Sequence, residues 1–375
     1  MTARPLARPL SHATPHPADE QLVARIDATL TDYLAERRRY TELVHPSFTE
    51  AADALTAFVL RGGKRVRPTF AWWGWRGAGG DPDGPLAGAV LAAVSALELI
   101  QASALVHDDL IDASDTRRGY PTVHVDFTGR HREQGWLGAP ERYGMAAAVL
   151  VGDLSLIWAD DMLHGAELPE QVRARVRPVW AAMRTDLVGG QLLDVRGQVS
   201  GDDTAATAMR VNRFKTAAYT VERPLQLGAA LAGAPAELVE AYGRFGADIG
   251  VAFQLRDDLL GVFGDPEVTG KPAGDDLREG KRTLLMALAM SAARERRDPA
   301  ALTVLSAALG NPELDDAGVC QVREVLRELG TSDVVEERIE QLTESALAAL
   351  AAVEVAEPAA TRLPELAHAA TRRLA

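Results

Sequence analysis

The chain has 375 residues, a formal net charge of −13, 47% hydrophobic residues and only 5% aromatic residues. The negative charge argues against a nucleic-acid partner and predicts a soluble, self-repelling surface. Cys320 is the only cysteine, which excludes an intrachain disulfide framework or a thiolate metal cluster and predicts a reducing, cytoplasmic location.

The composition predicts an all-α protein with a single domain. Alanine and leucine dominate, while the β-branched and aromatic residues typical of strands are scarce. No fixed-period repeat or compositional break divides the chain, so we expect one helical domain over residues 19–355. Residues 1–18 contain four prolines and two arginines without an apolar core, which predicts a disordered tail. Residues 356–375 form a C-terminal extension in this division.

In chain order, helical periodicity begins near Asp19, and glycine pairs at 62–63 and 79–80 mark early loops. Residues 86–111 are apolar on nearly every side, which predicts a central core helix. Its longest apolar stretch ends at Glu98 and is too short to span a bilayer, so we expect no transmembrane segment. A polar stretch over 126–143 predicts an exposed loop. Further helices are expected over 144–165, 169–197, 203–232, 236–263, 281–294, 299–309, 315–329 and 332–353, and Pro358 and Pro364 are expected to interrupt the C-terminal region.

The first candidate site residues are acidic and end the core helix. Asp108 and Asp112 lie four residues apart, on one helix face about 6 Å apart along the axis. Like charges at this spacing repel, and a divalent cation such as magnesium relieves the repulsion. The alternative is a solvated helix end.

A second acidic cluster, Gln254-Leu255-Arg256-Asp257-Asp258-Leu259-Leu260-Gly261, follows another apolar run. If the two helices face each other, their carboxylates hold several magnesium ions around one diphosphate. The alternative is that Asp257 and Asp258 merely pair with nearby arginines.

Basic groups accompany both acidic clusters. The turn Gly62-Gly63-Lys64-Arg65-Val66-Arg67-Pro68 carries three cations, and Arg117-Arg118 follows the first acidic cluster. Further groups are Lys215-Thr216, Lys271 and Lys281-Arg282. Ammonium and guanidinium groups are the side chains that bind phosphate oxygens. These groupings therefore indicate phosphate binding rather than ordinary surface ion pairs.

Over residues 20–350 the chain resembles the trans-isoprenyl (polyprenyl) diphosphate synthases. The segments that carry the resemblance are GGKRVRP (62–68), ALVHDDLIDASDTRRG (104–119), FKTA (214–217) and FQLRDDLLGVFGDPEVTGKPAGDDLREGKRT (253–283). The resemblance implies an isoprenoid synthase helical bundle around a central cavity, magnesium as cofactor and a homodimer. It also implies that isopentenyl diphosphate is joined to an allylic diphosphate.

The resemblance further assigns roles to residues of this chain. It implies that Asp108, Asp112 and Asp257 bind magnesium, and that Lys64, Arg67, Gln101 and Arg118 bind isopentenyl diphosphate. It places the allylic diphosphate on Arg117, Lys215, Thr216, Gln254, Lys271 and Lys281. One departure is Gly261, which stands where many relatives have a third aspartate. Metal binding on that side then depends on Asp257 and Asp258.

Product length is predicted from the residues that precede Asp108. Short-chain members of the family carry an aromatic plug four or five residues before this aspartate, whereas here the positions hold Ala104 and Ser103. The pocket is therefore expected to stay open past the first turn, with a floor at Ile100, Leu97 or Trp158. This favours geranylgeranyl diphosphate as the product, with farnesyl or longer products as alternatives.

Two other functions compete with a synthase. A class I terpene cyclase also ionises an allylic diphosphate with magnesium, but it needs no second diphosphate site, so the basic turn at 62–68 speaks against it. A non-catalytic partner subunit of a heteromeric synthase should have lost aspartates or basic positions that this sequence retains.

Overall fold

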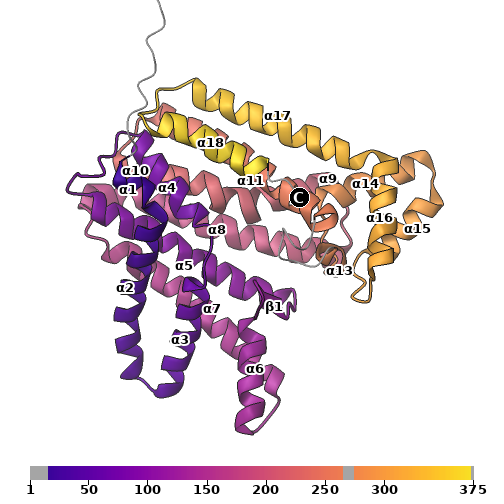
Figure 1. Ribbon diagram of the computed structural model, residues 1–375, viewed down its shortest axis with the longest axis horizontal. Helices are drawn as coiled ribbons and strands as arrows, with labels where there is room; N and C mark the ends of the chain where they lie inside the picture. The colour runs from indigo at the N-terminus through magenta and orange to yellow at the C-terminus, as the bar shows by residue number, and fades with distance from the viewer. Residues whose placement is uncertain (1–15, 265–273, 373–375) are drawn as a thin grey trace, which may run out of the picture.

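The computed structural model describes residues 16–264 and 274–372. Within these ranges the chain is helical except for turns and one antiparallel pair of two-residue strands, β1 (Thr116–Arg117) and β2 (Tyr120–Pro121). The predicted all-α class is therefore confirmed, and Figure 1 shows the long helices α5, α8 and α11 crossing the middle of the molecule.

The helices before the centre of the chain are α1 (Pro17–Glu20), α2 (Leu22–Glu42), α3 (Pro46–Leu60), α4 (Val66–Gly77), α5 (Ala87–Ile111), α6 (Val123–Gln134), α7 (Pro140–Gly165) and α8 (Glu170–Ser200). Those after it are α9 (Ala205–Val211), η1 (Asn212–Glu222), α10 (Arg223–Ala232), α11 (Ala236–Phe263), α13 (Asp275–Arg278), α14 (Leu284–Arg296), α15 (Pro299–Ala308), α16 (Asp316–Leu329), α17 (Thr331–Ala351) and α18 (Ala359–Thr371).

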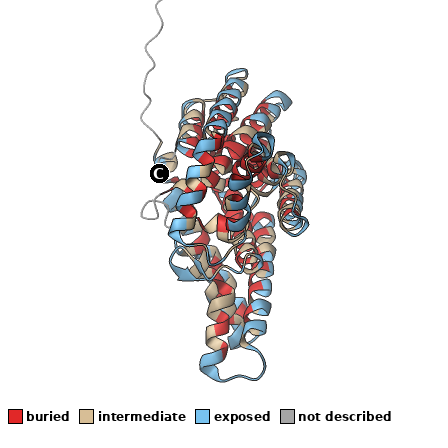
Figure 2. Ribbon diagram, turned by 90° about the vertical axis from the view of Figure 1, so that its right-hand side faces the viewer, coloured by how far each residue is buried: buried red, intermediate tan, exposed pale blue. Residues whose placement is uncertain are grey.

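Helix α5 is the core helix that its composition predicts. It packs along α7 and also contacts α2, α3 and α4, and buried residues line the interior of the bundle in Figure 2. By length and composition alone α5 would be able to cross a membrane, but 72% of its most apolar window is buried inside the fold. Burial against its neighbours accounts for the apolar character of this helix.

The prediction of an exposed loop over residues 126–143 is wrong for most of that range, because α6 extends to Gln134 and α7 begins at Pro140. Val123, Phe127 and His131, spaced four residues apart, are buried on one face of α6, and His131 packs against Tyr143 with ring centroids 5.7 Å apart. Gly135 then ends the helix at φ +62°. The buried stripe has helical spacing, but it is too narrow to stand out from the polar residues around it.

The expected interruption of the C-terminal region by Pro364 is also wrong. Pro364 lies inside α18, whose Ala359, Leu363 and Ala367 are fully buried. These side chains have helical spacing, and α18 contacts α4, α11 and α17. Burial of this face outweighs the loss of one backbone N–H to proline.

The segment η1, in the middle of the helix expected over 203–232, is a π-helix of 11 residues. Arg213 and Glu222 form an ion pair although they are nine residues apart. In an α-helix nine residues make about 2.5 turns, which would put the two side chains on opposite faces. The longer i→i+5 repeat of a π-helix brings them to the same side.

Three glycines of the flanking helices make room for this wider helix. An ideal Cβ at Gly190 of α8 would lie 2.2 Å from the backbone nitrogen of Lys215. Cβ atoms at Gly250 and Gly246 of α11 would lie 2.5 Å from Cα of Ala217 and 2.4 Å from Cα of Glu222. Any side chain at these positions would have to displace η1.

Candidate active site

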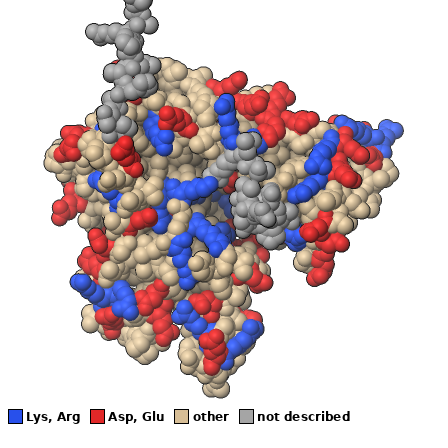
Figure 3. Space-filling model, in the orientation of Figure 1, with Lys and Arg blue, Asp and Glu red and all other residues tan. Residues whose placement is uncertain are grey.

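A cavity of about 650 Å³ opens where α5, α8, η1 and α11 meet. Its polar walls come from the ends of α5 and α11, and its cations come from the turn before α4, from η1 and from the segment before α14. On the face shown in Figure 3, lysine and arginine side chains gather near the centre, although the chain as a whole is acidic.

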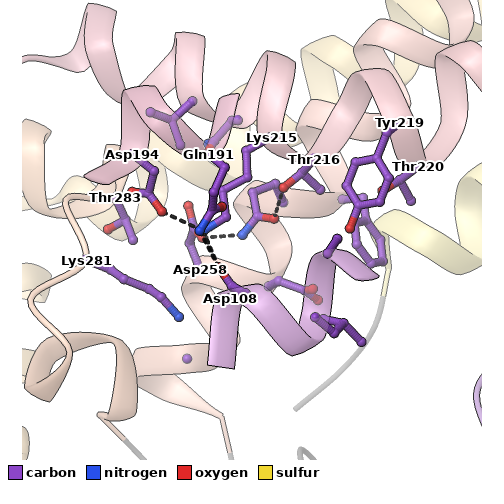
Figure 4. A pocket seen from close by; sticks show the side chains of 18 of the residues that line it. Asp108, Gln191, Asp194, Lys215, Thr216, Tyr219, Thr220, Asp258, Lys281 and Thr283 are labelled. Carbon is purple, nitrogen blue, oxygen red and sulfur yellow. Dashed lines mark hydrogen bonds and ion pairs between the residues drawn. The ribbon is translucent and has the colours of Figure 1, made fainter. Parts of the chain in front are cut away.

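Asp108 lies at the centre of a hydrogen-bonded group of four side chains. Its Oδ1 accepts hydrogen bonds from Lys215 Nζ at 3.0 Å and from Gln191 Nε2 at 2.8 Å. Lys215 Nζ also donates to Asp194 Oδ2 at 2.6 Å. Figure 4 shows Lys215 reaching from η1 between the two carboxylates. Burial alone would raise the pKa of Asp108, but the Lys215 ammonium holds it below its usual value.

Asp112, a predicted magnesium ligand, is not among the described residues that line the cavity, but it lies near Lys281, which does line it. Lys281 Nζ lies 3.8 Å from Asp112 Oδ2, 3.3 Å from Asp276 Oδ1 and 2.5 Å from Glu279 Oε2. Burial, followed by the negative charge of Asp108, raises the pKa of Asp112 to about 6. A cation bound between Asp108 and Asp112 would remove that repulsion.

The α11 wall carries Gln254, Asp257 and Asp258, which all line the cavity. Gln254 bridges two elements, since its Oε1 accepts from Thr216 Oγ1 at 2.7 Å and its Nε2 donates to Asp258 Oδ1 at 2.8 Å. Asp258 is only 4% exposed, and its Oδ2 has no hydrogen-bond partner among the described residues. Burial, followed by the charge of Asp276, raises the pKa of Asp258 to about 8.

These carboxylates fit magnesium that is shared with a phosphate ligand. Within residues 16–264 and 274–372, no three histidine, cysteine or acidic side chains lie close enough to hold a metal by themselves. Magnesium in proteins commonly uses one or two carboxylates and completes its shell with water and phosphate oxygens. The unsatisfied Oδ2 of buried Asp258 is an oxygen that such a cation would satisfy.

The basic turn places Lys64 and Arg67 on the same cavity as the acidic helix ends. Arg67 stacks on the Tyr219 ring at 4.1 Å and donates from Nη2 to Thr220 Oγ1 at 2.8 Å. The Tyr219 hydroxyl in turn donates to Gln101 Oε1 at 2.8 Å. Tyr219 therefore links Gln101 to Arg67, two residues that the resemblance assigns to one ligand.

The third cation of this turn, Arg65, points into the protein instead. Its guanidinium donates to Glu98, Asp27 and the carbonyl of Val59 at 2.7–2.9 Å, and its side chain is 3% exposed. Gly62 and Gly63, at φ +102° and +143°, allow the chain to reverse before this anchor. Arg65 thus holds the turn that presents Lys64 and Arg67.

Two of the remaining predicted cations, Arg117 and Arg118, pair with other groups of the protein. Arg117 pairs with buried Asp109, at 2.7 Å from its Nε to Oδ1, and Arg118 Nη1 donates to the carbonyl of Gly62 at 2.5 Å. Neither is among the described residues that line the cavity. Lys271 lies outside the described residues.

The residues predicted to control product length are only partly brought to the cavity. Ala104 lines it, together with Leu187 of α8. Ser103 and Ile100 are buried but are not among its lining residues, and neither are Leu97 and Trp158.

The cavity residues that were not predicted from the sequence include Gln191, Asp194, Tyr219 and Asp276. Gln191 and Asp194 follow a glycine pair on α8 and are three residues apart, which is a polar pair on one face of a long helix. That spacing could have identified Gln191 and Asp194 as candidate site residues. The sequence gave no such indication for Tyr219, because its position depends on the π-helical repeat.

Comparison with known proteins supports a common origin. Residues 49–325 match the polyprenyl synthetase family. The (2E,6E)-farnesyl diphosphate synthase of Mycobacterium tuberculosis is 38% identical over 222 residues, or 59% of this chain and 55% of that protein. The match thus spans about half the length of that relative. A short chain isoprenyl diphosphate synthase of Methanothermobacter thermautotrophicus is 29% identical and covers 82% of this chain and 92% of its own length.

Solved structures show the same relationship over nearly the whole chain. The geranylgeranyl pyrophosphate synthase of Corynebacterium glutamicum, solved with isoprenyl diphosphate and magnesium, is 45% identical with a TM-score of 0.91. The alignment covers 94% of this chain and 99% of that one. Because the family match extends over well more than half of its residues, this chain belongs to the polyprenyl synthetase family.

Proposed function

We propose that this chain is a magnesium-dependent prenyltransferase that condenses isopentenyl diphosphate with an allylic diphosphate. The observation that carries the proposal is a single cavity lined both by the acidic ends of α5 and α11 and by Lys64 and Arg67. Two anionic substrates need two cationic sites, and an allylic diphosphate that ionises needs a cation beside its leaving group. The relatives named above have products of this class.

The residues of this chain divide the chemistry between them. The bond between the allylic carbon and the diphosphate oxygen breaks, and Lys215 and Lys281 stabilise the charge that develops on the departing diphosphate. When bound, magnesium supplies Lewis-acid stabilisation of the same group, and Asp108, Asp112 and Asp257 would hold it.

The second substrate is held on the opposite wall. Lys64, Arg67 and Gln101 would bind isopentenyl diphosphate, so that its double bond attacks the allylic cation and forms the new carbon–carbon bond. The proton lost in the last step goes to the departing diphosphate. His107 is not placed to take it, because its Nε2 lies 3.2 Å from the carbonyl of Val149 on α7. Ala104, Leu105 and Leu187 line the cavity with apolar groups, which excludes water from the cation.

The test is product analysis of the purified chain by chromatography, with isopentenyl diphosphate and each short allylic primer, with and without magnesium. We expect elongated diphosphates only when both substrates and the metal are present. A cyclised hydrocarbon formed from geranylgeranyl diphosphate alone would instead support a terpene cyclase. Activity that requires a second polypeptide would support a partner subunit.

Geranylgeranyl diphosphate is the product that we propose. Short-chain relatives hold an aromatic plug four or five residues before the aspartate that corresponds to Asp108. Here these positions hold the small residues Ala104 and Ser103, and Ala104 borders the cavity. Farnesyl and longer products remain the alternatives.

The variant Ala104→Phe should shorten the main product by at least one isoprene unit, because its ring would fill the space beside Leu187. The measurement is the chain length of the dephosphorylated products. As a control, Ala317→Phe adds the same ring on the exposed surface of α16 and should leave the product unchanged. An unchanged product from Ala104→Phe would contradict this path for the growing tail.

We also propose that the chain forms a homodimer in the cytoplasm. Helices α7 and α8 expose apolar side chains at helical spacing, including Leu150 (66% exposed) and Leu192 (68% exposed). Exposed apolar stripes of this kind are typical of subunit interfaces. Cys320 is exposed, which is compatible with a reducing compartment.

The variant Leu150→Arg/Leu192→Arg should sediment as a monomer, because two buried charges would be left unpaired in the dimer. Sedimentation equilibrium measures the mass. The matched variant Leu43→Arg/Val44→Arg changes two exposed apolar residues elsewhere and should keep the wild-type mass. A monomeric wild-type chain would contradict the proposal directly.

A further inference from the structure

The basic turn before α4 is not held in place by its own residues. Gly62 and Gly63 adopt φ angles of +102° and +143°, a range that glycine enters freely and other residues rarely adopt. Within residues 16–264 and 274–372, the N–H groups of Gly62, Gly63 and Lys64 donate to no backbone carbonyl. The orientation of Lys64, which lines the cavity, therefore depends on contacts from other segments.

Repulsion between cations adds to this freedom. An ideal Cβ on Gly63 would lie 3.5 Å from Nη1 and Nη2 of Arg118 and 3.5 Å from Nη1 of Arg65. Burial lowers the pKa of Arg118, and the charges of Arg117 and Arg65 lower it further. Glu98 opposes this effect only in part. Because crowded guanidinium groups repel each other, the turn among them needs an attachment that does not depend on a bound anion.

The short hairpin of β1 and β2 reaches the turn from outside. Arg117 and Tyr120 pair across its two strands, and the ion pair of Arg117 with buried Asp109 fixes the hairpin to the end of α5. From this fixed base the tip of the hairpin contacts the turn, where Arg118 Nη1 donates to the carbonyl of Gly62 at 2.5 Å. The hairpin is therefore a firm support beside a turn that lacks its own.

Tyr120 makes a second contact between the hairpin and the turn. The guanidinium of Arg61, the residue that ends α3, lies over the Tyr120 ring at 4.5 Å from its centroid. A cation is attracted to the face of an aromatic ring without any anion. Arg61 directly precedes Gly62, so this contact fixes the point at which the turn begins. The Tyr120 side of the hairpin is not part of the core, since Tyr120 is 50% exposed.

We propose that Tyr120 is a positioning residue, whose ring holds Arg61 and thereby the basic turn in the orientation in which Lys64 and Arg67 bind isopentenyl diphosphate. The inference rests on the proposed function, which assigns that ligand to the turn. Tyr120 is not among the described residues that line the cavity, so it acts through Arg61 and not on the substrate. A turn that is already oriented loses less conformational freedom when the ligand binds. In the alternative, the ring only stabilises the hairpin.

Steady-state kinetics with each substrate varied in turn separates these two roles. Tyr120→Ala should raise the KM for isopentenyl diphosphate by about 2- to 5-fold, the range of an exposed cation–π contact. The kcat and the KM for the allylic primer should not change. Tyr120→Phe keeps the ring and should behave as the wild type does. As a matched control, Tyr40→Ala removes another exposed ring, on α2, and should also keep the wild-type values.

A double-mutant cycle tests the pair of residues itself. Arg61→Ala should raise the KM for isopentenyl diphosphate by at least the same factor, and adding Tyr120→Ala should raise it no further, since either change removes the contact. The proposal is overturned if Tyr120→Ala leaves this KM at the wild-type value, or if Tyr120→Phe raises it as Tyr120→Ala does. It is also overturned if Tyr120→Ala has its full effect in the Arg61→Ala background.

Native proteolysis of the full chain measures the turn without turnover. Trypsin cleaves after Arg61 and Lys64, which are exposed, and a released turn adapts more readily to a protease. Tyr120→Ala should therefore be cleaved after Lys64 about 2- to 5-fold faster than the wild type, and Tyr120→Phe at the wild-type rate.

These outcomes are distinguishable from a failure of the proposed function. A wild-type chain that elongates no allylic primer would contradict the prenyltransferase, while equal cleavage of Tyr120→Ala and the wild type would contradict the attachment of the turn. A chain that elongates primers, with Tyr120→Ala at the wild-type KM and cleavage rate, would contradict only the role of Tyr120.

Discussion

Replacing Asp108 by alanine should lower the rate of condensation by about 10³-fold or more, since this carboxylate is at once a proposed metal ligand and the partner of Lys215. The helix should survive, because alanine is a good helix former and α5 is held by packing along α7. The measurement is incorporation of labelled isopentenyl diphosphate at saturating magnesium, alongside far-ultraviolet circular dichroism.

Asp316→Ala is the matched control, because it removes an exposed aspartate of α16 and should keep the wild-type rate. Raising the magnesium concentration should not restore the activity of Asp108→Ala, since the lost carboxylate acts in the enzyme–substrate complex as well as in the binding of the metal. Turnover near the wild-type value in Asp108→Ala would remove the main support for the proposed mechanism.

Lys215→Met should affect both activity and stability. Lys215 lies between Asp108 and Asp194 at 3.0 and 2.6 Å, and the two carboxylates raise the pKa of its ammonium above the ordinary value although burial opposes this. Without the cation, two partly buried negative charges face each other, which should cost about 3 kcal/mol in the free energy of unfolding. The condensation rate should fall by about 10²-fold or more, because the leaving diphosphate loses a stabilising charge.

Urea unfolding and a condensation assay measure the two effects separately. In Lys215→Met/Asp194→Leu, one of the repelling charges is also removed, so stability should recover while activity stays low. If activity recovered together with stability, Lys215 would act only as a structural partner of the carboxylates, and its assigned contact with the diphosphate would be wrong.

Much of this arrangement was predictable from local sequence. Two apolar helices that each end in aspartates have to bury their apolar parts, and this brings their polar ends to the same side of the core. The positions of Asp108, Asp257, Lys64 and Arg67 around one cavity agree with that logic. The sequence predicted both the helices and the residue types that their ends present.

The rest depends on contacts between distant segments. Arg65 and Arg67 are two residues apart in a basic turn, yet one is buried against Glu98 and the other lines the cavity. Their different directions result from the left-handed conformation of Arg65, at φ +47°, which local composition does not encode. Arg117 likewise turns to Asp109, a neighbour for which the sequence predicted no role.

The π-helical segment η1 has a consequence for mutagenesis of this protein. Lys215 lines the cavity, but the helix that carries it packs against Gly190, Gly246 and Gly250, which have no side chain to offer any ligand. A library restricted to residues that border the cavity would therefore miss three positions at which a side chain is expected to displace η1. A methyl group added at Gly190 would collide with the backbone of Lys215 itself, and one added at Gly250 or Gly246 would collide with the backbone of Ala217 or Glu222 in the same π-helix.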